Sequence, residues 1–161
     1  MKAVFNSSPL IFLSKLNVID QAVKLFAEVT VPVYVREEIS RKEDIASDKV
    51  KDLLKSKDVV VVEAKNLRMV EALSGKLGKG ESETIVVAME QLADFVILDD
   101  HVARQEATRI GLNVKGTLGI IRRLTELDII QYELDKLYRD LSEMDFRVKR
   151  SIFDEIFKMG I

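Results

Sequence analysis

Short runs of β-branched and other apolar residues alternate with segments of helical periodicity along the chain, and this alternation limits the folds open to it. Five runs predict strands: Lys2–Phe5, Val29–Val31, Val59–Val62, Phe95–Leu98 and the short edge strand Leu112–Val114. Val59–Val62 is β-branched throughout, which is typical of a buried strand. Strands that alternate with helices form parallel sheets covered by helices. The sequence therefore predicts an α/β domain with a central, mainly parallel sheet.

Apolar residues at helical spacing predict the helices between these strands. They cover Leu10–Phe26 with a break at Asn17, a segment that starts near Val33, and then Asp48–Lys55, Leu67–Leu77, Glu81–Leu92, Val102–Ile110 and Thr117–Leu127. Ser8 is predicted to cap the first helix, because Pro9 behind it suits the first helical position. Thr117 is predicted to cap the last of them. Gly75, Gly78 and Gly80 predict a loop before Glu81, and Gly111 predicts a helix end.

Length and composition predict one soluble globular domain. The chain has 161 residues, enough for a single core. We expect one domain over 1–161, with a core at about 1–127 and two amphipathic helices within about 128–161, at Tyr132–Leu141 and Val148–Met159. No apolar stretch reaches the ~18 residues of a membrane span, and no signal peptide is recognisable. Cysteine is absent, which excludes disulfides and zinc thiolates. We therefore expect a cytoplasmic protein without a membrane segment.

Polar and acidic residues gather in four short clusters, each following or interrupting an apolar segment. They are Asn6-Ser7-Ser8, Glu37-Glu38, Glu81-Ser82-Glu83 and Asp99-Asp100. Sites in parallel sheets form beyond the carboxyl ends of the strands, so the first and last clusters share one edge if their strands are neighbours. Clustered carboxylates repel one another unless a cation intervenes. Oxygen ligands of this kind suit Mg²⁺ or Mn²⁺, which predicts a metal-dependent phosphodiester hydrolase.

Helical spacing ranks the glutamates within their clusters. Glu81 lies within about 40° of Ile85, Ala88 and Leu92 on a helical wheel, so it faces the buried side and needs a partner or a metal. Glu83 points the other way and is predicted to be peripheral. Purely structural roles stay open to all four clusters, because Asn and Asp cap helices and form turns, and glutamates stand in first helical turns or on solvated faces.

Glu38 lies beside the apolar stripe of its helix, whereas Glu37 faces solvent. Two further features carry less weight. Gly75 and Gly80 have the spacing of a phosphate loop, but Glu81 stands where the lysine must be. His101, the single histidine, faces away from the apolar side of its helix and is predicted to be an exposed bystander.

The clusters together resemble the PIN-domain ribonucleases, and more closely a PIN-like prokaryotic subfamily related to the toxin nucleases of toxin–antitoxin operons. The resemblance runs in family order from residue 3 to about 125, through the stretches Val4–Ile11, Val33–Ile39, Gly80–Ile85, Ile97–Arg104 and Gly111–Ile120. It implies a three-layer α/β/α sandwich that is frequently dimeric. It also implies RNA as the substrate, a bound Mg²⁺ or Mn²⁺, and an antitoxin-like protein as a partner.

The resemblance also implies roles for single residues. Metal ligands are expected at Asn6, Glu38, Glu81 and Asp100, and catalytic residues at Glu38, Glu81, Asp99 and Asp100, with Glu83 and Ser8 in secondary positions. Asp100 or Glu81 would orient or deprotonate the attacking water. Lys76, Lys79 and Arg104 flank the clusters in sequence and are candidate phosphate contacts, or else solvated surface charges.

One residue departs from the family pattern and leaves two functional predictions open. Asn6 stands where the family has its first metal-binding aspartate, and an amide offers a neutral oxygen without the charge. The chain is therefore expected to be either a metal-dependent ribonuclease, toxin-like by resemblance, or a PIN-like RNA- or protein-binding regulatory module with weakened catalysis. Apolar stripes on the last two helices predict either a homodimer contact or the completion of the chain's own core.

Overall fold

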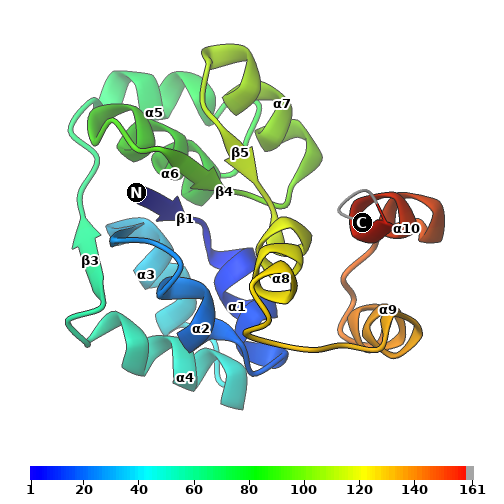
Figure 1. Cartoon of the computed structure of the whole chain (residues 1–161). Coiled ribbons are helices and arrows are strands. Elements are labelled where there is room, and N and C mark those ends of the chain that lie inside the picture. Colours follow the sequence, from blue (N-terminus) through cyan, green and yellow to red (C-terminus); the bar gives the residue numbers. More distant parts are fainter. Residues whose placement is uncertain (159–161) are drawn as a thin grey trace.

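A parallel five-stranded sheet forms the centre of the protein, as a computed structural model that describes residues 1–158 shows (Figure 1). The strands lie in the order β3-β2-β1-β4-β5, with bounds β1 Lys2–Phe5, β2 Glu28–Pro32, β3 Val59–Val62, β4 Phe95–Ile97 and β5 Val114–Lys115. Ala3 of β1 pairs with Val29 on one side and Phe95 on the other. The first strand is therefore central, and its carboxyl end lies directly beside that of β4.

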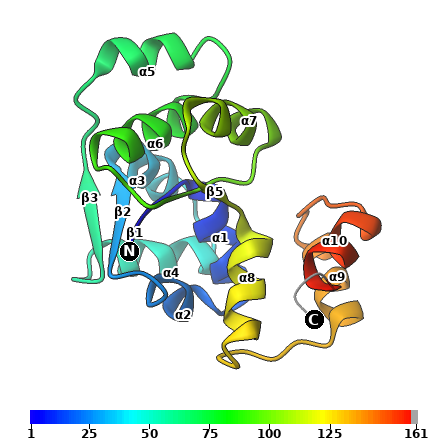
Figure 2. The ribbon, with the colours of Figure 1, turned by 45° about the horizontal axis from the view of Figure 1, so that its top comes forward.

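Helices cover both faces of the sheet, as predicted for a three-layer α/β/α sandwich (Figure 2). One face carries α1 Ser7–Lys15, α2 Ile19–Val23, α4 Ile45–Leu54 and α8 Thr117–Glu126, and the other carries α5 Leu67–Leu73, α6 Lys79–Glu90 and α7 His101–Ile110. The alternation of side chains along a strand feeds two separate cores. Ala3 and Phe5 pack in the first core and Val4 in the second.

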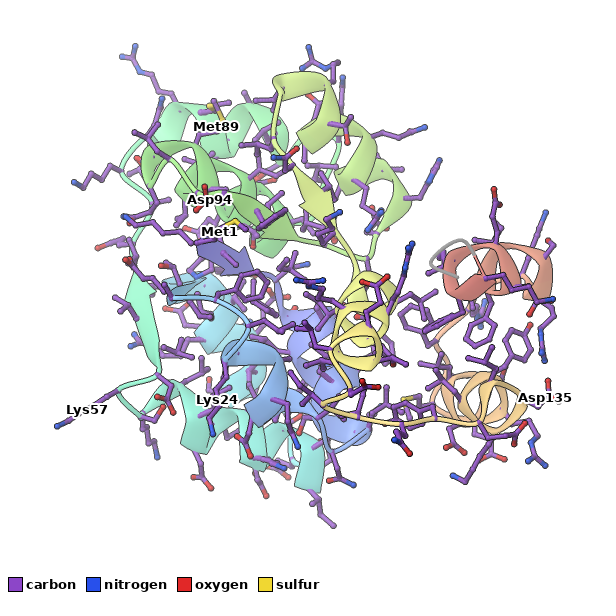
Figure 3. The ribbon with its side chains drawn as sticks, in the orientation of Figure 1. Met1, Lys24, Lys57, Met89, Asp94 and Asp135 are labelled. Atoms are coloured by element: carbon purple, nitrogen blue, oxygen red, sulfur yellow. The ribbon has the colours of Figure 1, made fainter. Side chains whose placement is uncertain are left out.

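Helix α3 (Val33–Ser40) follows β2 and contacts both α4 and α6. It therefore bridges the two helical layers at the carboxyl edge of the sheet. The opposite, amino edge is marked in Figure 3 by Met1 and Asp94. There the Asp94 N–H donates to the Lys2 carbonyl at 2.9 Å, which fixes the start of β4 against β1.

The helical segment is interrupted at Asn17, as predicted. Asn17 lies between α1 and α2 and has a left-handed backbone with φ 60°. Ser8 is not the helix cap, so that prediction was wrong. Helix α1 already begins at Ser7, with Asn6 at the cap position, and the Asn6 side chain makes no capping bond. The wrong prediction relied on Pro9 opening the helix, but Pro9 is the third helical residue, where its missing N–H is also tolerated.

Several element bounds differ from prediction. Helix α4 begins at Ile45 because Asp44 caps it through the Ser47 N–H at 2.7 Å. Helix α5 stops at Leu73, before the predicted Leu77, and α6 begins at Lys79, before the predicted Glu81, so the loop covers 74–78 and Gly80 lies in the helix. The edge strand was predicted at Leu112–Val114, but the observed strand β5 begins later and pairs through Val114 and Lys115. Val59–Val62 was predicted to be buried but is the other edge strand, and Val60 is 48% exposed.

Two C-terminal helices, α9 Leu134–Glu143 and α10 Arg150–Lys158, follow the sandwich. Their apolar stripes face each other, and ring side chains fill the space between them (Figure 3). Leu137, Leu141 and Phe153 are fully buried within the single chain. The predicted end of the last helix at Met159 lies outside the described residues. No helix in the described range has the length and apolar character of a membrane span.

The homodimer stays a prediction, now with a more exacting test. Leu137 and Leu141 of the two C-terminal stripes are buried within one chain, but Ile152 on α10 is 46% exposed. The other stripe residues in the described range are partly buried: Leu134, Tyr138, Val148 and Ile156. Light scattering at micromolar concentration should give about twice the 18.3 kDa of one chain. If Ile152 contributes to the contact, Ile152→Glu should shift the mass to that of the monomer. A parent mass near 18.3 kDa would contradict the dimer.

Candidate metal centre at the carboxyl edge of the sheet

Asn6 lies at the centre of the carboxyl edge, directly after β1. It is only 4% exposed, and its backbone N–H donates to the Ile97 carbonyl of β4 at 3.1 Å. Its side-chain Oδ1 lies 3.4 Å from the Thr84 hydroxyl of α6, which bonds more closely to the Gly80 carbonyl at 2.7 Å. The amide oxygen is thus weakly engaged and directed toward the start of α6, where it could serve as a ligand.

Glu38 approaches the same place from α3, whereas Glu37 is exposed, as their spacing predicted. The Oε1 atom of Glu38 is buried and has no hydrogen-bond partner within residues 1–158. Burial raises the pKa of Glu38, and Glu83 adds to the rise, although Lys42 and Arg41 partly oppose it. A buried carboxylate oxygen without a donor is costly. A cation is one group that would satisfy it.

The glutamate fits in this position only because residue 80 is glycine. A Cβ atom on Gly80 would overlap Oε1 of Glu38 and lie 3.0 Å from its Cδ. Gly80 therefore belongs to the first turn of α6 and to the site, and not to a flexible loop as the sequence suggested. Its importance was invisible in the sequence, because the neighbouring carboxylate comes from another helix.

Glu81 lies half-buried in the first turn of α6, with the carboxylates of Asp100 and Glu38 nearby. Burial raises the pKa of Glu81 most, the Asp100 carboxylate raises it further, and Glu38 adds a smaller rise. The Gly78 N–H opposes the shift by hydrogen bonding to the carboxylate. Glu38 and Asp100, which were predicted to converge with Glu81, therefore lie near enough to raise its pKa.

Asp100 and Asp99 act partly as helix caps. Asp100 is exposed and caps α7 through the Ala103 N–H at 3.0 Å. Asp99 caps α8: its two carboxylate oxygens accept from the Thr117 N–H at 2.7 Å and the Thr117 hydroxyl at 2.6 Å. Thr117 was predicted to cap this helix itself, but it is the first helical residue and is held by Asp99. Both aspartates therefore cap helices, which was the structural alternative, and both also lie at the edge of the site.

Asp99 is more firmly held than the other acidic residues. Burial raises the pKa of Asp99, while the two Thr117 bonds and the Arg104 guanidinium lower it in part. Arg104 Nη1 also donates to the Leu98 carbonyl at 2.9 Å. Asp99 is therefore bonded to Thr117, and Arg104 is bonded to the adjacent Leu98 carbonyl and acts on Asp99 through its charge. These contacts hold β4, α7 and α8 together at this edge.

The remaining predicted residues lie farther out or on another side. Ser8 is exposed on the first turn of α1, and His101 is exposed as predicted. Lys76 is exposed after α5, and the Lys79 ammonium lies 4.8 Å from the centre of the Tyr34 ring. Glu83 was predicted to be peripheral but is buried, with only 8% of its surface exposed. The run Ile85-Val86-Val87 signals this, because it shows that α6 is covered on all sides.

The donors at this edge fit a hard cation, although they do not form a closed cage. Asn6, Glu38 and Glu81 supply oxygen ligands only, one carboxylate oxygen has no partner, and burial disfavours the ionised glutamates. Within residues 1–158 no three acidic, histidine or cysteine side chains are close enough together to hold one ion. Mg²⁺ commonly uses one or two carboxylates and keeps several waters. That coordination matches this donor set.

We expect Glu81→Gln to raise the melting temperature of the metal-free protein. A carboxyl whose pKa is raised on folding favours the folded state below its unfolded value, near 4.5, and this contribution is lost as pH rises through the folded pKa. The amide avoids that loss. The advantage of Glu81→Gln should therefore be small at pH 4.5 and grow toward pH 8, in thermal melts with a chelator. A less stable variant at pH 8 would show instead that the Gly78 bond makes Glu81 a structural residue.

A comparison with protein families agrees with this architecture. Residues 2–159 match the family model described as PIN domain, which is nearly the whole chain. No curated protein is similar enough to count as a relative. The match extends through the C-terminal helices, beyond the stretches that carried the resemblance in the sequence. The chain therefore belongs to the PIN-domain family.

Proposed function

We propose that the protein is a metal-dependent endoribonuclease that hydrolyses RNA phosphodiester bonds at the carboxyl edge of its sheet. The observation that carries the proposal is Oε1 of Glu38 beside Gly80, which has no hydrogen-bond partner in the described chain. Glu81 lies next to it, and its pKa is raised by burial and by Asp100. PIN domains have a nuclease-like fold, so this group of oxygen donors lies where a nuclease site is expected. A toxin-like role, an antitoxin-like protein partner and a homodimer are part of the proposal.

The residues would divide the work as follows. Asn6, Glu38 and Glu81 would hold Mg²⁺ or Mn²⁺, with Asp100 at the outer side. When bound, the metal would polarise the scissile phosphate and make a water more acidic. Glu81 is the proposed proton acceptor, because burial and the Asp100 carboxylate raise its pKa above the ordinary range. Asp99 would position this edge through Thr117. Lys76, Lys79 and Arg104 are the candidate phosphate contacts.

The proposal predicts that Glu81→Gln lowers the rate of RNA cleavage by at least about 100-fold, the lower end of what a general base contributes. The assay uses a labelled RNA pool with Mn²⁺ or Mg²⁺, and a chelator should abolish the cleavage. Glu143→Gln is the matched control, because Glu143 is exposed near the end of α9 and loses the same charge. Equal cleavage by Glu81→Gln and the parent would contradict the role of Glu81.

A second function is favoured by one observation. Asn6 is neutral, buried and placed where a third ligand charge would sit. A regulatory module that binds RNA or protein without cleaving it would tolerate this residue. RNA binding by gel shift without metal-dependent cleavage, under conditions where the parent is folded, would support the module over the nuclease.

A further inference from the structure

An acidic cavity lies beside the candidate metal centre, lined by other residues of α3 and α6. It has a volume of about 460 Å³ and opens between α3, α5 and α6. In Figure 2, α6 lies between the other two helices, and it contacts both of them. Among the residues that the structure describes, four glutamates line it, Glu37, Glu63, Glu71 and Glu83, against a single cation, Lys79. None of these four is an expected metal ligand or the proton acceptor of the proposed nuclease. Glu83 was expected only in a secondary position, and Lys79 only as a candidate phosphate contact.

Glu83 places a carboxylate with unsatisfied hydrogen-bonding capacity in this cavity. It is the buried member of the four, with 8% of its surface exposed, and its Oε2 has no hydrogen-bond partner in the described chain. Burial raises the pKa of Glu83, and the Lys79 ammonium and the Tyr34 N–H lower it only in part. Lys79 does not complete the pairing: its ammonium lies over the Tyr34 ring at 4.8 Å, and no ion pair within 4.0 Å joins it to Glu83. Within residues 1–158, the cavity thus contains a buried carboxylate that makes no ion pair, although the Lys79 charge lowers its pKa in part.

The walls of the cavity favour an organic cation over a metal ion. No three carboxylates within residues 1–158 are close enough to hold one ion, so a bare ion would find too few ligands here. Leu67 and Val70 form an apolar wall beside the acidic groups. A long cationic side chain lays its carbon stem along such a wall and its charge against carboxylates. A guanidinium also matches carboxylates with two parallel bonds and stacks on aromatic rings.

We propose that this cavity receives an arginine side chain from a partner protein. The guanidinium bonds to Glu83 and Glu71 beside the Tyr34 ring, and the stem lies along Val70. Leu67, which lines the cavity, is 64% exposed. A residue flanking the arginine in the partner would cover Leu67, which a free small cation would leave bare. Arginine anchors surrounded by apolar contacts dominate many protein interfaces.

The test is an amide NMR titration of the full chain with the peptide acetyl-Ala-Leu-Arg-Leu-Ala-amide. The matched probes are the same peptide with citrulline, which is neutral and nearly isosteric, and N-acetyl-arginine amide, which lacks the flanking residues. We expect the arginine peptide to shift resonances of α3, α5 and α6. It should bind at least tenfold more tightly than either probe, a difference of about 1.4 kcal/mol. Neither RNA nor metal is present, so the outcome is independent of the proposed nuclease activity.

Two pairs of variants locate the binding. Glu83→Gln should weaken the arginine peptide about tenfold or more, whereas Glu143→Gln, on the remote helix α9 in Figure 1, should not change it. Lys79→Ala should tighten binding, because the competing ammonium leaves the Tyr34 ring, and Lys76→Ala should have no effect. The Lys79 comparison decides the question even if Glu83→Gln fails to fold.

Three results would overturn the proposal. Equal affinity for the arginine and citrulline peptides would show that the guanidinium is not recognised. Equal affinity for N-acetyl-arginine amide and the peptide would assign the cavity to a small free cation and not to a protein. Competition between Mn²⁺ and the peptide for the same α5 and α6 resonances would make the cavity a metal site.

Discussion

Asn6→Asp should raise the affinity for Mn²⁺ at least about tenfold, and RNA cleavage with it, because affinity in oxygen-ligand sites follows the number of ligand charges. The same variant should melt at a lower temperature than the parent when metal is removed. The new carboxylate is buried at a position that is 4% exposed, beside Glu38 and Glu81, and like charges without a cation repel. Isothermal titration with Mn²⁺ and thermal melts with and without a chelator measure both effects.

Asn113→Asp is the control for this change, because Asn113 is exposed and gains the same charge away from the site. It should alter neither Mn²⁺ binding nor cleavage. No Mn²⁺ binding by the parent together with no gain in Asn6→Asp would refute the metal centre. A parent that binds and cleaves as well as Asn6→Asp would show that the amide is a full ligand, and it would remove the argument for a weakened module.

Gly80→Ala should abolish the function of Glu38 while leaving the fold intact. The added methyl group would occupy the space of Glu38 Oε1 and displace that carboxylate, a side-chain end that can move. Alanine in a helix is also favoured over glycine by roughly 1 kcal/mol, which offsets the local strain. We therefore expect a melting temperature close to that of the parent, with Mn²⁺ binding and cleavage reduced to the level of Glu38→Gln.

The double variant Gly80→Ala/Glu38→Gln tests the mechanism of this loss. If the methyl group acts only through Glu38, the two changes together should be no worse than Glu38→Gln alone. Gly75→Ala is the matched control, since a Cβ there would meet only the Ala72 carbonyl at 3.6 Å. Normal metal binding by Gly80→Ala would contradict the placement of Glu38. Global unfolding would show that the first turn of α6 cannot adjust.

Local patterns in the sequence were enough to predict the layers of the fold. Four of the five strands overlap the predicted runs closely, and the fifth, β5, shares only Val114 with its predicted position. The break at Asn17 and the helix end at Gly111 were also predicted, because left-handed backbone at these positions is a local property of Asn and Gly. Element bounds were less predictable. Asp44 extends α4 by capping it, and Asp99 caps α8 from a distant part of the chain.

The burial of single residues depended on neighbours that the sequence does not name. Val59–Val62 reads as an internal strand, but it is an edge strand because strand order is decided by how the crossovers pack. Glu83 was predicted to be peripheral from the helical wheel, but residues 82–88 of α6 are all buried, so periodicity does not mark an exposed face in this stretch. Periodicity describes one helix at a time, whereas burial is a property of the assembled layers.

By itself, the sequence determined the α/β class, the oxygen-donor chemistry of the four clusters and the family, because each depends on residue types in order along the chain. Only the tertiary structure decided which donors meet. Pairing of β1 with β4 brings Asn6 beside the Asp99-Asp100 turn, and the packing of α3 on α6 sets Glu38 against Gly80. It also divided the acidic residues between a candidate metal centre and a separate cavity around Glu83. The physical reason is that charge interactions and close contacts depend on distances through space, which packing fixes, and not on separation along the chain.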